Sequence, residues 1–168
     1  SHRKACDAIA AGRFAGEIVP VTIPGGKGAP QVLDRDEPPR ADTSLEKLAR
    51  LAPVYPEGIC TAGNSSSEND GAAALVVMSA DRARALGLDP LARIAAHAVA
   101  AADPTLTYPA VPAAVSKCLA RAGIGIEAVD LIEIQEAFAA QVLADAQLMG
   151  LTPADCEARV NVNGSGIS

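Results

Sequence analysis

Aromatic side chains are almost absent from this chain of 168 residues, which has two tyrosines, two phenylalanines and no tryptophan. Proteins that bind single-stranded nucleic acid stack bases on aromatic side chains, and this chain has too few for such a platform. It also has no excess of positive charge, because its formal net charge is -6. Binding to a phosphate backbone needs a basic surface, so we expect no nucleic-acid partner.

Long apolar runs and closely spaced cysteines are missing as well. No run approaches the ~20 apolar residues that span a bilayer, so we expect no membrane span. The chain has only two histidines and no C-x-x-C pair, so we expect no metal site. Its first residues do not have the pattern of a signal peptide, and the few cysteines favour a cytoplasmic protein with free thiols. The cysteines are scattered at Cys6, Cys60, Cys118 and Cys156.

The chain is instead rich in small and aliphatic residues. Hydrophobic residues account for 49% of the chain and charged residues for 20%, a balance that allows a buried core. Apolar stretches predict strands at 72–78, 91–101, 129–134 and, beginning a fourth, at 160–163. Capping residues and 3.6-residue periodicity predict helices at 79–86, 112–122 and 136–149. This alternation of strand and helix predicts an α/β fold in which helices cover a sheet.

Residues 1–71 have a different character. We expect the end of a helix within 1–15, an extended run at 17–23, and loops at 24–41 and 58–71. Thr43 and Glu46 have the spacing of a capping box, which predicts a short helix ending near Leu51. We interpret this part as a cap or insertion on the α/β core. The last residues fall inside a strand-to-loop element, so we expect the chain to be a segment of a larger protein.

Two places could carry chemistry on the residue pattern alone. Gln135 and Glu136 follow the expected strand 129–134, and α/β sheets bind ligands at the carboxyl ends of their strands. Glu136 could equally serve only to stabilise the helix dipole. The Ser-, Asn- and Gly-rich loop 61–71 either binds a ligand closely or is a hydrogen-bonded connector. His97 fits a core position better than a catalytic base, and no cysteine can be named as a nucleophile from its spacing.

Three segments, taken in order, are much more specific than their parts. Residues 61–74 (TAGNSSSENDGAAA) resemble the T-A-G-N-x-S-G-x-N-D-G-A-A-A motif of the thiolase family. Residues 133–141 (EIQEAFAAQ) resemble its E-x-N-E-A-F-A-A-Q motif, and residues 161–168 (NVNGSGIS) resemble its N-x-x-G-G-x-I-A motif. Residues 12–20 and 34–55 also follow the family, so the resemblance covers essentially the whole chain. A generic flavodoxin-like binding module would not explain three motifs in this order.

The resemblance implies the thiolase fold, which is a five-layered α-β-α-β-α core in the complete protein, here present as an incomplete segment. Residues 1–68 then form the later part of the loop domain that binds CoA. Residues 69–88 close the N-terminal half, and residues 89–168 begin the C-terminal half. Thiolases of this kind form homodimers or homotetramers, and we expect the same here.

The resemblance also implies an activity in fatty acid metabolism, including β-oxidation. The complete protein would transfer acyl groups between 3-oxoacyl-CoA and CoA, by thiolytic cleavage or by the reverse Claisen condensation. A cysteine acyl-enzyme carries this reaction, and its catalytic cysteines and histidine lie outside this segment. Coenzyme A and acyl-CoA are substrates, and no cofactor is bound permanently. The alternative is a non-catalytic thiolase-like protein that binds acyl-CoA or lipid.

Matching residues imply particular roles. Gln135 would hold the water of an oxyanion hole, Ser66 and Ala62 would line the pantetheine tunnel, and Arg40 would lie near the adenine end. The remaining matches are Ala137 and Phe138 as walls of the pantetheine site, Phe138 alternatively as plain core, and Leu106 as a boundary of the acyl pocket. The chain departs from the family pattern at Gln135 (usually Asn), Ser67 (usually Gly), Glu68 (usually apolar) and around Leu106.

Overall fold

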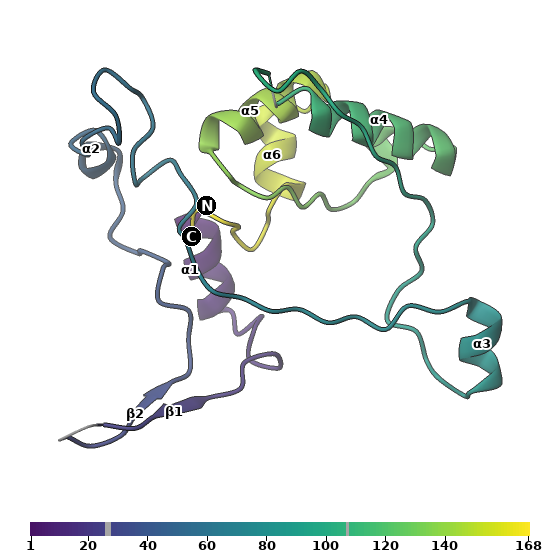
Figure 1. Ribbon diagram of the computed structural model, residues 1–168, viewed down its shortest axis with the longest axis horizontal. Helices are drawn as coiled ribbons and strands as arrows, with labels where there is room; N and C mark the ends of the chain where they lie inside the picture. Colours follow the sequence, from purple (N-terminus) through teal and green to yellow (C-terminus); the bar gives the residue numbers. More distant parts are fainter. Residues whose placement is uncertain (26–27, 107) are drawn as a thin grey trace. The chain divides into compact units, whose positions relative to one another are not determined.

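The computed structural model describes residues 1–25, 28–106 and 108–168 (Figure 1). Its α-helices are α1 (His2–Ala10), α2 (Leu45–Leu48), α3 (Ala80–Ala85), α4 (Ala110–Ala122), α5 (Ala139–Leu148) and α6 (Pro153–Arg159). A 3₁₀ helix spans Ile126–Ala128, and strands β1 (Val21–Ile23) and β2 (Gln31–Leu33) form a hairpin. The chain divides into two units, one of residues 1–67 and 129–168 and the other of residues 68–128. The first unit therefore combines the two ends of the sequence.

Helix α1 anchors the first unit by packing against the segment that follows α6. Lys4 Nζ donates hydrogen bonds to the carbonyl oxygens of Cys156 and Val160, both at 2.8 Å. Ala5 is buried at this contact, where a Cβ on Gly164 would lie 2.7 Å from the Ala5 Cβ. Small residues on both sides thus allow the close approach. The two ends of the chain meet here, and Ser1 Oγ donates to Ser168 Oγ at 2.9 Å (Figure 1).

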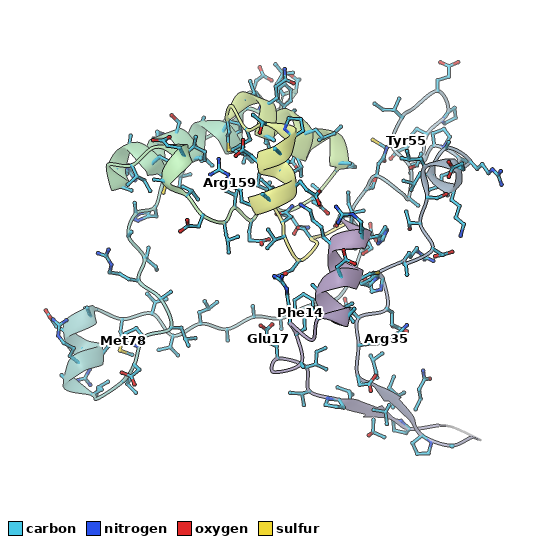
Figure 2. The ribbon with its side chains drawn as sticks, turned by 180° about the vertical axis from the view of Figure 1, so that it is seen from behind. Phe14, Glu17, Arg35, Tyr55, Met78 and Arg159 are labelled. Carbon is cyan, nitrogen blue, oxygen red and sulfur yellow. The ribbon has the colours of Figure 1, made fainter. Side chains whose placement is uncertain are left out.

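Residues 129–134, an expected strand, run parallel to the chain at Val160. Ile132 forms an isolated bridge with Val160, and its amide donates to the Arg159 carbonyl at 2.8 Å. The side chain of Arg159, the last residue of α6, donates to the Val129 carbonyl at 2.7 Å (Figure 2). The pairing is too short to count as a strand, so the expected strands 129–134 and 160–163 are reduced to bridges.

The sequence analysis missed helix α6, although its start has a strong local signal. Thr152 and Asp155 form a complete capping box, with Pro153 in the first turn. The Thr152 amide donates to Asp155 Oδ2 at 2.9 Å, and the Asp155 amide donates to Thr152 Oγ1 at 3.1 Å. The hydrogen bond that the Thr152 hydroxyl donates to the Asp155 carboxylate is the main cause that lowers the pKa of Asp155 below its ordinary value.

Two local expectations for residues 24–51 are wrong. The stretch 24–41, of which residues 26 and 27 lie outside the described part, contains β2, because β1 needs a partner and Val32 pairs with Thr22. Ser44, and not Thr43, caps α2, with its Oγ accepting from the Lys47 amide at 3.3 Å. The Thr43 amide instead donates to the Arg40 carbonyl in a turn, which moves the helix start by one residue.

The second unit confirms the expected cap of α3 and the glycines that follow α3 and α4, while α4 begins at Ala110, two residues before the expected start. Ser79 caps α3 by accepting from the Arg82 amide at 3.2 Å, and Gly87 follows with φ +66°. Gly123 caps the C-terminus of α4 in the left-handed conformation, with φ +71°. Each of these signals acts within a few residues of the chain, so it needs no distant partner.

The expected strands 72–78 and 91–101 are not strands in this structure. Leu75, Val76 and Val77 are 84, 87 and 71% exposed, and Leu91 is fully exposed. A strand exists only where a neighbouring strand accepts and donates its backbone hydrogen bonds, and the described part of the second unit offers none. Residues 72–78 and 91–101 therefore form no β-sheet hydrogen bonds with a neighbouring strand among the described residues.

Candidate functional site

The loop around Ser66 lies beside the residues that precede α5. The Ser66 amide donates to the Ala137 carbonyl at 3.0 Å, and the Ala139 amide donates to the Asn64 carbonyl at 2.9 Å. Ser65 and Phe138 form an antiparallel bridge between these two contacts. This pairing holds Phe138 in an extended conformation, so α5 begins at Ala139 and not at Glu136 as expected.

Asn64 shapes the loop from within. Its Oδ1 accepts from the Thr61 amide at 2.8 Å, and its Nδ2 donates to the Ile59 carbonyl at 2.9 Å. Gly63 packs against side chains of the α2 region, where a Cβ would lie 2.5 Å from Leu48 Cδ2. The loop is thus a hydrogen-bonded connector, as one interpretation of its sequence expected, and ligand binding by its residues stays a prediction.

The third motif, residues 161–168, also contacts Ser66. Gly166 O accepts a hydrogen bond from Ser66 Oγ at 2.9 Å and another from the Ser67 amide at 3.3 Å. Gln135 Nε2 donates to Ser66 Oγ at 3.5 Å, from a side chain that is exposed. Three segments far apart in the sequence therefore converge on the Ser66 hydroxyl, with the Gln135 amide directly beside it.

A buried frame holds the backbone on either side of Gln135. Asn161 is 3% exposed; its Oδ1 accepts from the Ile134 amide and its Nδ2 donates to the Ile134 carbonyl, both at 2.8 Å. Glu136 is 9% exposed and accepts from the Ile167 amide at 3.2 Å and from Asn161 Nδ2 at 3.4 Å. The carboxylate of Glu136 thus bonds to the third motif, and because α5 begins at Ala139, Glu136 is not in the first turn of that helix.

A cavity of about 660 Å³ borders this frame at Glu136 and Ile167. It is lined by charged and polar groups of α1 together with Arg40 and Glu136, and by apolar side chains of α5 such as Val142. The Arg40 amide donates to His2 Nδ1 at 3.3 Å. Burial is the main cause that lowers the pKa of His2, and the positive charge of Arg40 lowers it further, which favours the neutral imidazole.

The described residues form no cluster of metal ligands, no disulfide and no helix that could span a membrane. In residues 1–25, 28–106 and 108–168, no three histidine, cysteine, aspartate or glutamate side chains gather closely enough to hold a metal ion. The four cysteines are free thiols of intermediate exposure. Among the described helices, none has the length and apolar character needed to cross a membrane.

Comparison with known protein families identifies the family to which this chain belongs. A family model described as the N-terminal domain of thiolase matches residues 1–81, and one described as the C-terminal domain of thiolase matches residues 88–168. The chain belongs to the thiolase family. Its first 81 residues match one thiolase domain and residues 88–168 match the other.

Several curated relatives match this thiolase chain along its whole length. It is 49% identical over 169 residues to the acetyl-CoA acetyltransferase of Pseudomonas aeruginosa, covering 100% of this chain and 42% of that protein. It is 50% identical to a probable acetyl-CoA acetyltransferase of Escherichia coli, with the same coverage. It is 44% identical over 174 residues to the 3-ketoacyl-CoA thiolase of Marinobacter nauticus, covering 100% of this chain and 43% of that protein. The chain therefore spans about two fifths of the length of these relatives.

Solved structures confirm the fold. The crystal structure of the Bacillus anthracis acetyl-CoA acetyltransferase matches with a TM-score of 0.87 and 45% identity, over 99% of this chain and 41% of that chain. The human mitochondrial 3-ketoacyl-CoA thiolase matches with a TM-score of 0.87 and 36% identity, with the same coverage. The α/β thiolase fold is confirmed, and the chain is an incomplete segment of it.

The structure brings together some of the residues expected for the thiolase site. Ser66, Gln135, Ala137 and Phe138 lie in one place, and the Phe138 side chain is 47% exposed in this chain. Arg40 instead lines the cavity, and Ala62 is exposed in the turn before Asn64. Leu106 belongs to the second unit and is 49% exposed; its neighbour at position 107 lies outside the described residues.

Sequence reasoning missed the supporting residues Asn161 and Gly166. A signal for Asn161 exists, because asparagine is one of the few side chains that tolerate the left-handed backbone conformation, and its φ is +47°. Gly166 has no such signal, since only the folded structure shows which side chains approach it. Both residues lie in the third motif, whose role the sequence analysis left unassigned.

Proposed function

We propose that the complete protein containing this chain is an acyltransferase that moves acyl groups between a 3-oxoacyl-CoA and CoA. The observation that carries the proposal is the convergence of three thiolase-like motifs on Ser66. The names of the relatives, acetyl-CoA acetyltransferase and 3-ketoacyl-CoA thiolase, support the same class of reaction. The nucleophilic cysteine and the catalytic histidine come from parts of the protein outside this segment.

The residues of this chain would bind and orient the substrate. The exposed ring of Phe138 and the backbone at Ala137 offer an apolar wall for pantetheine beside the Ser66 hydroxyl. Ser66 Oγ is held by the Gly166 carbonyl and so has a fixed position from which to contact the thioester arm. Arg40, with the cavity that it lines, would receive the phosphate-bearing end of CoA, because a guanidinium pairs well with phosphate.

Gln135 is the one residue of the chain that we propose as catalytic. Its exposed amide has donors and an acceptor, so it can hold a water at the place where negative charge develops on a thioester oxygen. The bond from Nε2 to Ser66 Oγ orients that amide toward the proposed pantetheine path. Leu106 and Ala62 remain proposed contacts of the acyl pocket and the tunnel.

The setting of the complete protein is proposed on the same basis. We place it in the cytoplasm, as a homodimer or homotetramer that uses CoA and acyl-CoA substrates without a resident cofactor. Residues 1–68 form the later loop domain, residues 69–88 end the N-terminal half, and residues 89–168 begin the C-terminal half. Participation in β-oxidation follows from the thiolytic direction of the reaction.

Thiolysis of acetoacetyl-CoA, followed by loss of the enolate absorbance, tests the proposal. The complete protein should consume acetoacetyl-CoA only when CoA is present, and the isolated 168-residue chain should show no turnover, because it lacks the groups that act as a unit. Absence of thiolysis by the complete protein would refute an enzymatic role. Binding of CoA without turnover would support a non-catalytic thiolase-like protein that binds acyl-CoA or lipid.

A further inference from the structure

Gly166 lies where a side chain cannot fit. A Cβ at this position would be 2.2 Å from Gln135 Nε2 and 2.9 Å from Ser66 Oγ. Non-bonded heavy atoms pack at about 3.5–4.0 Å, so even a methyl group would overlap the amide. The backbone of Gly166, unlike that of Gly164, has no positive φ. Glycine is therefore needed here for space and not for backbone conformation.

The backbone around Gly166 is held and cannot easily move away. Its carbonyl accepts from Ser66 Oγ at 2.9 Å. On one side, Ser165 Oγ donates to the Ile134 carbonyl at 3.2 Å, and on the other the Ile167 amide donates to Glu136 at 3.2 Å. Gln135 Nε2, in contrast, is the end of a flexible and exposed side chain. A methyl group at position 166 would thus displace the amide and leave the backbone in place.

We propose that Gly166 is a positioning residue, whose missing side chain makes room for the amide of Gln135 against Ser66. The consequence for catalysis rests on the function proposed above, but the packing does not. A glutamine side chain reaches one methylene farther than asparagine, which carries the same amide. With asparagine at position 135, the amide should end short of Gly166, so a methyl group there would meet only the Ser66 hydroxyl, at 2.9 Å from Oγ, and a small rotation of that side chain would accommodate it. Positions 135 and 166 are therefore coupled.

A double-mutant cycle in the complete protein tests this coupling. The variants are Gly166→Ala, Gln135→Asn and both together. Gly16→Ala is the matched control, because a Cβ at Gly16 meets no atom within 4 Å among the described residues and its φ is not positive. We measure kcat and KM for acetoacetyl-CoA thiolysis and the Tm of each variant.

We expect Gly166→Ala to lower kcat by a factor that depends on the residue at position 135. Gly166→Ala should lower kcat on the order of tenfold, as for a displaced water-holding group, with KM and Tm close to wild type. The same change in the Gln135→Asn background should lower kcat by about twofold or less. An unchanged kcat in Gly166→Ala overturns the proposal, as do equal losses of kcat or Tm in the two backgrounds.

Crystal structures of the complete protein and of its Gly166→Ala variant give a readout that needs no activity. We expect the Gln135 amide to leave Ser66 Oγ in the variant while the backbone of residues 134–137 stays in place. An amide that keeps its position overturns the proposal. If the wild-type protein shows no thiolysis, the proposed function fails, and the two structures still decide whether Gly166 positions Gln135.

Discussion

Replacing Asn161 with alanine should loosen the frame that holds Gln135. The substitution removes the acceptor for the Ile134 amide and the donor to the Ile134 carbonyl, both at 2.8 Å in a site where Asn161 is 3% exposed. The carbonyl keeps the Ser165 hydroxyl as a donor, so the Ile134 amide bears most of the loss. A buried amide without a partner costs about 1–3 kcal/mol.

The backbone adds a second contribution at Asn161. Its φ of +47° lies in the left-handed region, where alanine is disfavoured by roughly 1–2 kcal/mol. Asparagine tolerates this region better than other side chains, so part of that cost is new in the variant. Together the two effects amount to about 2–4 kcal/mol, which raises the equilibrium constant for local opening roughly 30- to 1000-fold, since 1.4 kcal/mol is a factor of ten.

Hydrogen exchange measured by mass spectrometry on peptides that contain Ile134 is the direct assay. In the complete protein, Asn161→Ala should speed exchange of these peptides within that range, while peptides from α4 should exchange as in wild type. Asn161→Asp is the control that keeps the acceptor for the Ile134 amide. The Asn161→Asp variant brings a second carboxylate next to Glu136. It should therefore slow hydrogen exchange at Ile134 more at low pH, where the new carboxyl group is protonated. Unchanged exchange at Ile134 in Asn161→Ala would refute the role of the frame.

Three further predictions concern the site and its supporting helix. Ser66→Trp should block the proposed pantetheine path and raise the KM for CoA sharply, whereas an unchanged KM would place the path elsewhere. Gln135→Ala should lower kcat on the order of tenfold or more while Gln135→Asn stays active, and an alanine variant with full kcat would make the amide structural. Burial raises the pKa of Asp145, outweighing the hydrogen bond from Gln141, so stability should fall as pH rises from the ordinary aspartate pKa to the raised one. Asp145→Asn should remove that fall in a series of Tm measurements against pH, and an identical pH profile would contradict it.

Local signals explain why the helix ends were predictable. Ser79, Gly87 and Gly123 act on backbone groups within one turn of their own positions, so their effect can be inferred from a few neighbouring letters. The same reasoning failed at Thr43, because its amide is engaged by Arg40 in a preceding turn. It would have found α6, whose Thr152 and Asp155 form an ordinary capping box.

Distant contacts explain what could not be predicted. Apolar residues at 72–78 indicate a tendency to form a buried strand, but a strand needs a neighbour, and the described part of the unit has none. The juxtaposition of Ser66 and Gln135 followed from resemblance to a family and not from spacing. The fit of Gly166 against Gln135 depends on how two segments distant in the sequence are placed in space, which the sequence pattern does not show.

The division of the first unit into two sequence ends has a consequence for how the site assembles during folding. About 60 residues, from 68 to 128, separate the Ser66 loop from the Gln135 segment. Closing a flexible loop of that length costs about 3.6 kcal/mol of entropy beyond a constant, so the contact between Ser66 and Ala137 should form late, after the local turns of α5 and α6. Doubling the intervening length would add only about 0.6 kcal/mol. The second unit can therefore gain surface insertions with little effect on the equilibrium stability of the site.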